Sequence, residues 1–272
     1  MTESFLVGGT YELTSDQVEF YQQNGFIKLK NVLSRQEIDH FNDVISVEVT
    51  KLNRDARPME ERDTYAKAFV QITNLWTRNE SIKNLVFSPR LAQIAKELMK
   101  VTSVRLYHDQ ALFKEAGGGY TPWHADQYYW PLDSDHSITA WIPLQETTLE
   151  MGALEFSAGS HQLLTGRELA IGDDSEHVVS EALKSGGYER IVESFDLGEV
   201  SFHAGWTFHR AAPNRTEKIR KVMCTIYMDG NMRLKNPSNE HQKLDWEVWC
   251  PGAQVGEIID TSLNPILFER AS

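Results

Sequence analysis

From residue 101 the sequence changes from helical to period-two patterning, and this change constrains the fold more than any other feature. The run V-T-S-V-R-L-Y-H-D-Q-A-L-F-K at 101–114 predicts a long strand, because successive residues of a strand point to opposite faces. Further strand-like runs lie at 137–144, 153–157, 199–203, 207–213 and 219–228. Short strands separated by Gly, Pro and Asn predict a closed or sandwich-like antiparallel sheet, a jelly roll.

The first hundred residues carry helical signals instead. Thr14 can cap a helix that ends at Asn24-Gly25, since Gly is a common residue just after a helix. Ser34 opens a long stretch whose apolar positions follow helical spacing as far as Leu52. A short strand and two further helices are expected at 26–30, 79–87 and 89–100.

These patterns predict a single α+β domain spanning residues 1–272. Residues 1–100 are expected to form a mainly helical support, and residues 101–228 the jelly-roll core. A partly helical insertion at 162–190 interrupts the strands. Residues 229–272 form a C-terminal tail that is expected to pack over the core or a subunit partner rather than to take part in chemistry.

Charge and cysteine content exclude several classes of protein. Lys and Arg total 27 against 39 Asp and Glu, a net charge of −12, which argues against nucleic acid or an anionic membrane as partner. The N-terminal residues lack the features of a signal peptide, and no apolar run approaches the about eighteen residues of a membrane span. Cys224 and Cys250 form no C-x-x-C motif, so we expect neither a disulfide scaffold nor a structural zinc site, and a cytoplasmic location.

The stretch T-P-W-H-A-D-Q-Y-Y-W at 121–130 sets two metal-binding side chains, His124 and Asp126, among large aromatic residues. On a strand, residues two apart share a face, so both can point into the mouth of a barrel. A single H-x-D occurs often by chance, and the alternative is a hydrogen-bonded His near a surface Asp. A third ligand decides between them, and His209 is the best candidate because of the residues that follow it.

The segment at 207–222 predicts a hairpin, two strands around the four-residue loop N-R-T-E at 214–217. In that pairing Arg220 lies on the same face as His209, one pair away. Its neighbours on that face are the apolar residues Val222, Cys224 and Ile226. An unpaired guanidinium there is costly, so an anion should meet it; a salt bridge to a sheet-edge carboxylate is the alternative.

Two imidazoles and one carboxylate, from His124, Asp126 and His209, leave open positions on the opposite side of a metal. That ligand set is the facial triad of non-haem Fe(II) oxygen chemistry. Arg220 beside it offers a place for the far carboxylate of a chelating 2-oxo acid.

Several motifs, taken together in this order and spacing, carry a resemblance to a known family. They are W-H-A-D at 123–126, A-W-I-P-L at 140–144, G-A-L-E-F-S-A-G-S-H at 152–161 and H-R-A-A-P-N-R-T-E-K-I-R at 209–220. The sequence resembles the phytanoyl-CoA dioxygenase family of Fe(II)/2-oxoglutarate-dependent oxygenases, from about Phe20 to the C-terminus. The resemblance implies a cupin-like double-stranded β-helix with helices on one side, which agrees with the strand pattern.

The resemblance also implies the cofactors and the roles of individual residues. His124, Asp126 and His209 look like the Fe(II) ligands, and Arg220 looks like the anchor of the 2-oxoglutarate C5 carboxylate. Trp141 resembles a tryptophan that packs on the co-substrate. With O2, such a site hydroxylates an unactivated C–H of a small organic substrate and releases succinate and CO2.

Gln110 falls where the family places a co-substrate contact on the preceding strand. Period two sets it on one mostly apolar face with Val104, Leu106, His108 and Leu112. Two further positions are informative. The family often has a hydroxyl two residues after the second His, where this chain has Ala211, so the carboxylate needs another donor besides Arg220. Related halogenases replace the Asp of H-x-D by a small residue, so Asp126 disfavours halogenation.

The substrate pocket is the least defined part of the site. Aromatic and His side chains near the metal strand can line it or cage an ammonium group, and core packing is the alternative for each: His108, Tyr128, Tyr129, Trp130 and Trp76. The loop E-A-G-G-G-Y at 115–120 is either a lid or a plain turn. Nothing resembles a phosphate-cradling loop, so an acyl-CoA substrate is not favoured.

The main alternative from another class is a cupin-like metal-binding protein without oxygenase activity. Arg220 distinguishes the two, because such a protein has no need of a carboxylate anchor beside the metal. A jelly roll without metal leaves the clustered ligands unexplained. The expected partner is therefore a small-molecule substrate.

Overall fold

The computed structural model describes residues 7–53 and 57–269; the N-terminal residues 1–6 of the signal-peptide argument lie outside that range. The helices in chain order are α1 (Ser15–Asn24), α2 (Arg35–Leu52), α3 (Thr64–Ala68), α4 (Glu80–Val86), α5 (Pro89–Met99), α6 (Asp173–Ser185) and α7 (Glu240–Trp249). A 3-10 helix, η3, spans Asp126–Tyr129. No helix in the described part of the chain is long and apolar enough to cross a lipid bilayer.

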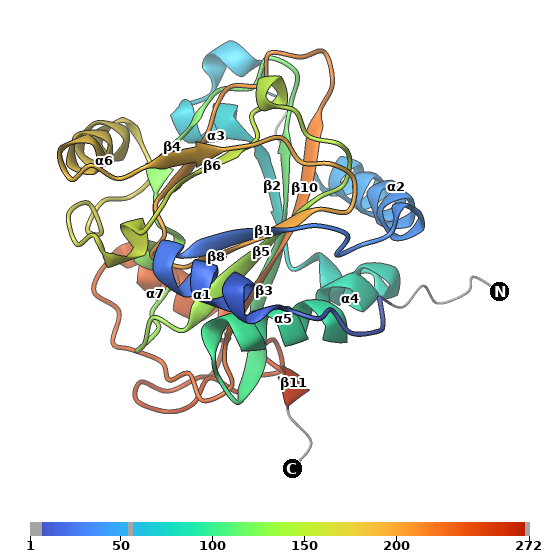
Figure 1. The fold of residues 1–272 in the computed structure, drawn as a ribbon, viewed down its shortest axis with the longest axis vertical. Helices are drawn as coiled ribbons and strands as arrows, with labels where there is room; N and C mark the ends of the chain where they lie inside the picture. The colour runs from blue at the N-terminus through green and yellow to red at the C-terminus, as the bar shows by residue number, and fades with distance from the viewer. Residues whose placement is uncertain (1–6, 54–56, 270–272) are drawn as a thin grey trace.

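Two antiparallel sheets form the core. The large sheet contains β1 (Phe26–Leu29), β2 (Val70–Thr73), β3 (Ser103–Lys114), β5 (Ser137–Pro143), β8 (Val200–Ala204), β10 (Arg220–Asp229) and β11 (Ile266–Glu269). The small sheet contains β4 (Thr121–His124), β6 (Leu154–Ser157), β7 (Arg190–Val192) and β9 (His209–Ala211), in the order β4-β9-β6-β7. The predicted jelly roll is confirmed, and α6 lies in the predicted insertion (Figure 1).

Helix boundaries follow the sequence signals. Thr14 and Ser34 each cap a helix through a capping box, in which side chain and backbone of two residues satisfy each other's exposed N–H groups. Gly25 ends α1 in the left-handed conformation (φ 78°) that its lack of a Cβ permits. Pro89 occupies the first turn of α5, where its missing N–H costs no helical hydrogen bond.

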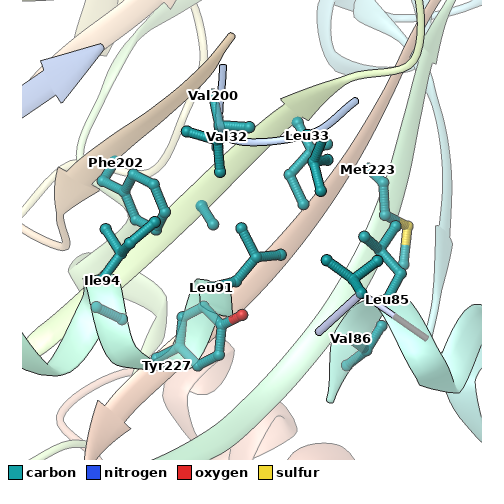
Figure 2. Close-up of a cluster of buried hydrophobic side chains, with 14 of the residues drawn as sticks. Val32, Leu33, Leu85, Val86, Leu91, Ile94, Val200, Phe202, Met223 and Tyr227 are labelled. Atoms are coloured by element: carbon teal, nitrogen blue, oxygen red, sulfur yellow. The ribbon is translucent and has the colours of Figure 1, made fainter. Parts of the chain in front are cut away.

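Helices α1, α2, α4 and α5 cover the outer face of the large sheet, whereas α3 lies beside β4 of the small sheet (Figure 1). Leu91 and Ile94 of α5 face Val200 and Phe202 of β8 and Met223 and Tyr227 of β10, as Figure 2 shows. These side chains are buried, and each contributes about 1.5–3 kcal/mol by leaving water. The helical layer therefore seals one face of the large sheet and leaves the other face for the site.

The predicted hairpin at 207–222 is wrong. β9 pairs with β4 and β6 in the small sheet, whereas β10 pairs with β3 and β5 in the large sheet. The connecting loop passes between sheets, and Asn214 organises it by donating to the carbonyl oxygens of Lys114, Glu115 and Lys218. His209 and Arg220 therefore face each other across the sandwich rather than along one ladder.

A bulge in β3 corrects the predicted face of Gln110. Ile226 pairs with His108 and Tyr227 with Leu106, so Tyr107 is the extra residue. Leu106 consequently packs toward the helices, while His108, Gln110 and Leu112 face the inside of the sandwich. Only the residues after the bulge share a face with Gln110; the expectation for Val104 and Leu106 is wrong.

The glycine-rich loop at 115–120 is held on both sides by backbone hydrogen bonds. Gly117 donates to Asn214 O at 3.1 Å, Asn214 donates to Gly118 O at 3.0 Å, and Gly119 donates to Lys67 O at 2.7 Å. Residues 117–119 thus form a turn that is tied to the loop at Asn214 and to α3.

Candidate metal centre and co-substrate pocket

Two histidines lie side by side at one end of the small sheet. His124 is the last residue of β4 and His209 the first of β9; the two are register partners, and their ring centroids are 4.1 Å apart. Asp126 is the first residue of η3, but Ala125 before it is still extended (φ −123°, ψ 129°). His124 and Asp126 therefore lie on the same side of the chain, as alternation predicted, and the chain turns only after them.

The hydrogen bonds of the two rings fix which nitrogen is free. Nδ1 of His124 donates to Pro122 O at 2.8 Å, and Nδ1 of His209 donates to Thr207 O at 2.9 Å, because a carbonyl oxygen can only accept. Burial lowers the pKa of both imidazoles to about 4, so they are neutral and carry a lone pair on Nε2.

Those lone pairs point at one carboxylate oxygen. Nε2 of His124 and Nε2 of His209 lie 3.6 Å and 3.7 Å from Asp126 Oδ1, and the three ligand atoms fall within 4.8 Å of one another. Three electron-rich atoms without a shared hydrogen repel one another unless a cation lies between them. The donor set of two imidazoles and one carboxylate therefore fits a divalent transition metal.

The other oxygen of Asp126 is held by two residues that we did not predict from the sequence. Thr139 Oγ1 donates to Asp126 Oδ2 at 3.1 Å, and His203 Nε2 lies 3.3 Å from the same atom. Burial opposes ionisation, but the surrounding histidines hold the pKa of Asp126 well below its usual value. Thr139 and His203 are register partners on β5 and β8, so the large sheet orients a ligand of the small one.

A sequence signal for His203 does exist. In V-S-F-H at 200–203, the apolar Val200 and Phe202 face the helices. Period two then sends Ser201 and His203 to the inner face, where a buried imidazole needs a polar partner.

Arg220 is a buried cation in the same cavity. Its side chain is 2% exposed, it donates from a terminal N–H to Gly152 O at 2.7 Å, and its guanidinium carbon lies 5.4 Å from the ring centroid of Trp141. Nε has no hydrogen-bond partner, and no ion pair within residues 7–53 and 57–269 involves Arg220. Burial lowers its pKa only to about 10, so it stays charged and can pair with an anion that enters the cavity.

The hydroxyl missing at Ala211 has a counterpart on the neighbouring strand. Thr121 is the register partner of Ala211 and lines the same cavity as Arg220. Lys114, opposite Arg220 in the β3–β10 ladder, donates from Nζ to Thr121 Oγ1 at 3.2 Å. Because that oxygen already accepts from Lys114, its own hydrogen is available for a carboxylate. Burial, and then Arg220, lower the pKa of Lys114 to about 6.

One cavity of about 570 Å³ joins these groups. It is lined by most of the residues predicted from the sequence: His124, Asp126, His209, Arg220, Trp141, Gln110, His108, Tyr129 and Trp130. Gln110 Oε1 accepts from Gln71 Nε2 at 2.5 Å, and Gln71 Oε1 accepts from the Tyr65 hydroxyl at 2.7 Å. This chain of amides forms the wall next to the predicted co-substrate position.

Two predicted pocket residues lie elsewhere. Trp76 packs on Phe87, with ring centroids 5.0 Å apart, against the helix-covered core. Tyr128 contacts Tyr129 and His241 but does not line the cavity. Both are packing residues, the alternative given for each.

The C-terminal tail packs over the core, as expected, and its helix α7 also forms a wall of the cavity. The lining residues from α7 are His241, Leu244, Asp245 and Trp249. Trp249 stacks on His108 with ring centroids 4.7 Å apart and 21° between the planes. Opposite them, Tyr65 and Phe69 enter from α3 and the residue after it.

The chain matches a known protein family over the segment that carries this site. The family model for phytanoyl-CoA dioxygenase matches residues 21–222, about three quarters of the chain and all of the predicted metal and co-substrate residues. The chain belongs to the phytanoyl-CoA dioxygenase family. This membership confirms the resemblance carried by the sequence motifs.

Two relatives in this family and one solved structure span most of the chain. A probable alpha-ketoglutarate-dependent hypophosphite dioxygenase of Stutzerimonas stutzeri is 24% identical over 226 residues, covering 78% of each chain. A methylphosphonate hydroxylase of Gimesia maris is 23% identical over 227 residues, covering 81% of this chain and 84% of its own. The crystal structure of SnoK, a non-haem alpha-ketoglutarate-dependent carbocyclase from nogalamycin biosynthesis, superposes with a TM-score of 0.78 at 23% identity, over 95% of this chain and 99% of its own.

The predicted enzyme class, an Fe(II)/2-oxoglutarate-dependent dioxygenase, is confirmed by the family. The SnoK likeness confirms the double-stranded β-helix. The phytanoyl-CoA dioxygenase family thus supplies the reaction class, and the cavity of this chain supplies the residues from which individual roles are argued.

Proposed function

We propose that this protein hydroxylates a C–H of a small organic substrate, with Fe(II) held by His124, Asp126 and His209. The observation that carries this proposal is the convergence of two Nε2 lone pairs on one carboxylate oxygen, in the cavity that also contains Arg220. Arg220 needs an anion, and the far carboxylate of 2-oxoglutarate supplies one. Arg220 favours this proposal over a cupin-like protein without oxygenase activity, because such a protein has no use for a buried guanidinium beside the metal.

The residues of the chain fix geometry rather than perform the oxidation. When bound, iron with 2-oxoglutarate and O2 supplies the oxidant that inserts oxygen into the C–H and yields succinate and CO2. Pro122 O and Thr207 O keep the imidazole hydrogens on Nδ1, so that Nε2 always faces the metal position. Thr139 and His203 keep Asp126 Oδ2 occupied and leave Oδ1 as the ligand atom.

The co-substrate is positioned by charge and packing. Arg220 is proposed to grip the C5 carboxylate, with Thr121 as the hydroxyl donor in place of the residue at Ala211. Trp141 packs against the guanidinium and Gln110 lies on the adjoining wall. The enclosing aromatic residues exclude water, which protects the chain from uncoupled oxidation. A cytoplasmic location is supported by Cys224 and Cys250, both free thiols.

An anaerobic titration tests this function. Fe(II) and 2-oxoglutarate together are expected to produce the weak visible charge-transfer band of the chelate, and candidate substrates should stimulate succinate release. 2-Oxobutyrate is the matched control, since it chelates but lacks the carboxylate for Arg220, and it should bind far more weakly. Iron binding without any band would favour the cupin-like alternative.

Replacing the proposed hydroxyl donor gives a prediction for the co-substrate alone. Thr121→Val should raise the 2-oxoglutarate concentration needed for half-maximal band formation by about tenfold, because one hydrogen bond to a charged group is lost. Iron affinity should not change. Thr121→Ser restores the hydroxyl and should restore affinity; equal binding by the Val and Ser variants would remove Thr121 from the anchor.

A further inference from the structure

Asp245 is a carboxylate in the cavity that neither the metal nor the co-substrate uses. It projects from α7 and accepts from the Tyr107 hydroxyl at 3.4 Å. Burial raises its pKa to about 7, although hydrogen bonds from Trp249 and Tyr107 oppose that effect. No ion pair in the part of the chain that the structure describes involves it.

The described charged residues that line the cavity include no Lys or Arg that is available to Asp245. Among the described lining residues, the carboxylates are Asp126 and Asp245, and Arg220 is the one Lys or Arg. Asp126 faces the metal position and Arg220 faces the co-substrate. An anionic substrate would therefore find no free Lys or Arg among these described residues and would meet Asp245, which repels it; His241, one turn before Asp245 on α7, is the lining imidazole on the same helix.

Asp245 also belongs to the same compartment as the metal position. The Tyr65 hydroxyl lies within electrostatic reach of both carboxylates: burial, then Asp126 and Asp245, raise its pKa to about 12. On the other side, His108 stacks on Trp249, and both line the same cavity as Asp245 and Asp126. One small molecule can therefore touch Asp245 and still reach the metal end.

Aromatic rings surround the space in front of this carboxylate. The aromatic residues that line the cavity together with Asp245 include Trp249, Trp130, Tyr129, Tyr65 and Phe69. Faces of such rings attract cations by about 0.5–2 kcal/mol, and more so when water is excluded. Uncharged rings with one unpaired carboxylate form a site for an ammonium group on an apolar body, not for a phosphonate or a diphosphate.

We propose that the substrate carries a basic nitrogen, protonated in water, that pairs with Asp245 among these rings while an apolar part presents its C–H to the metal end. This inference rests on the proposed function and names the substrate class of that site. It separates this chain from relatives named for hypophosphite and methylphosphonate, although the metal-binding motif is shared with the family.

The test uses three probes of equal chain length, hexylammonium, 1-hexanol and hexylphosphonate, added to the protein loaded anaerobically with Fe(II) and 2-oxoglutarate. Binding is measured by calorimetry and by the shift of the chelate band. Hexylammonium should bind at least about tenfold more tightly than the alcohol, as expected for one desolvated ion pair, and the phosphonate should bind most weakly.

Variants locate the effect. Asp245→Asn should lose the preference for hexylammonium over hexanol, while Asp245→Glu should keep part of it. Glu247→Gln removes the same charge from an exposed position of α7 and should leave the preference unchanged. Hexanol or hexylphosphonate binding as tightly as hexylammonium, or an unchanged preference in Asp245→Asn, would overturn the inference. If the chelate band forms in these experiments the proposed function stands regardless; if it never forms, the function itself fails.

Discussion

His209→Ala loses ferrous iron and all turnover. The Nε2 atom of His209 lies 3.7 Å from Asp126 Oδ1 and is one of the three proposed ligand atoms. Without it, His124 and Asp126 alone cannot form a facial site. Loss of residues that only orient a ligand costs 10- to 100-fold in metal affinity, so loss of a ligand should exceed about 100-fold. Anaerobic equilibrium dialysis measures bound iron, and succinate formation measures turnover.

The neighbouring His203 provides the sharpest comparison. Its ring centroid is 4.5 Å from that of His209, and its Nε2 faces the opposite oxygen of Asp126. If His203 only positions Asp126, then His203→Ala should keep measurable iron at about 10- to 100-fold weaker affinity. His177→Ala, on the exposed side of α6, controls for the loss of an imidazole. A reversed order, with His203→Ala iron-free and His209→Ala loaded, would reassign the third ligand.

Arg220→Met should abolish 2-oxoglutarate binding while sparing iron. Removing one partner of a buried, hydrogen-bonded charge pair costs about 2–5 kcal/mol, or roughly 30- to several thousand-fold in affinity. The measurement is the chelate band as 2-oxoglutarate is titrated into the iron-loaded protein. Arg220→Lys keeps the charge but lacks the planar guanidinium, so its affinity for 2-oxoglutarate should lie between those of the parent and of Arg220→Met.

Two controls separate loss of the anchor from loss of the fold. 2-Oxobutyrate has no far carboxylate, so its weak binding should be the same in the parent and in Arg220→Met. The Met variant breaks no ion pair with a described residue but loses the hydrogen bond to Gly152 O, so its melting temperature without co-substrate is measured to check that it is folded. Parental affinity for 2-oxoglutarate in Arg220→Met would contradict the anchor assignment.

Local signals predicted the secondary structure well because they act over a few residues. Capping at Thr14 and Ser34, Pro89 in a first turn and the period-two runs after residue 101 each depend on neighbours in the chain. The candidate metal and co-substrate residues, His124, Asp126, His209 and Arg220, stand in short motifs and could be singled out in the same way. The arrangement of these residues across the two sheets could not be predicted.

What escaped prediction depends on pairing between distant segments. The run around N-R-T-E has the length of a hairpin, yet β9 and β10 find partners in different sheets, and no local signal distinguishes the two outcomes. Thr139 and His203, which hold the second oxygen of Asp126, come from strands of the other sheet and stand in none of the motifs around His124. Asp245 comes from a helix more than a hundred residues after His124, and only the folded chain shows that α7 closes the cavity.

The proposed metal ligands and Arg220 stand on different sheets, and this has a consequence for the choice of co-substrate. The imidazole ligands stand on β4 and β9, whereas Arg220 stands on β10 across the sandwich. Face-to-face sheets pack at a nearly constant spacing of about 10 Å, so the distance from metal to guanidinium is fixed by the fold rather than by a flexible loop. If Arg220 anchors the far carboxylate, oxaloacetate, one methylene shorter, and 2-oxoadipate, one methylene longer, should both bind less tightly than 2-oxoglutarate, because the thickness of the core would select the five-carbon acid.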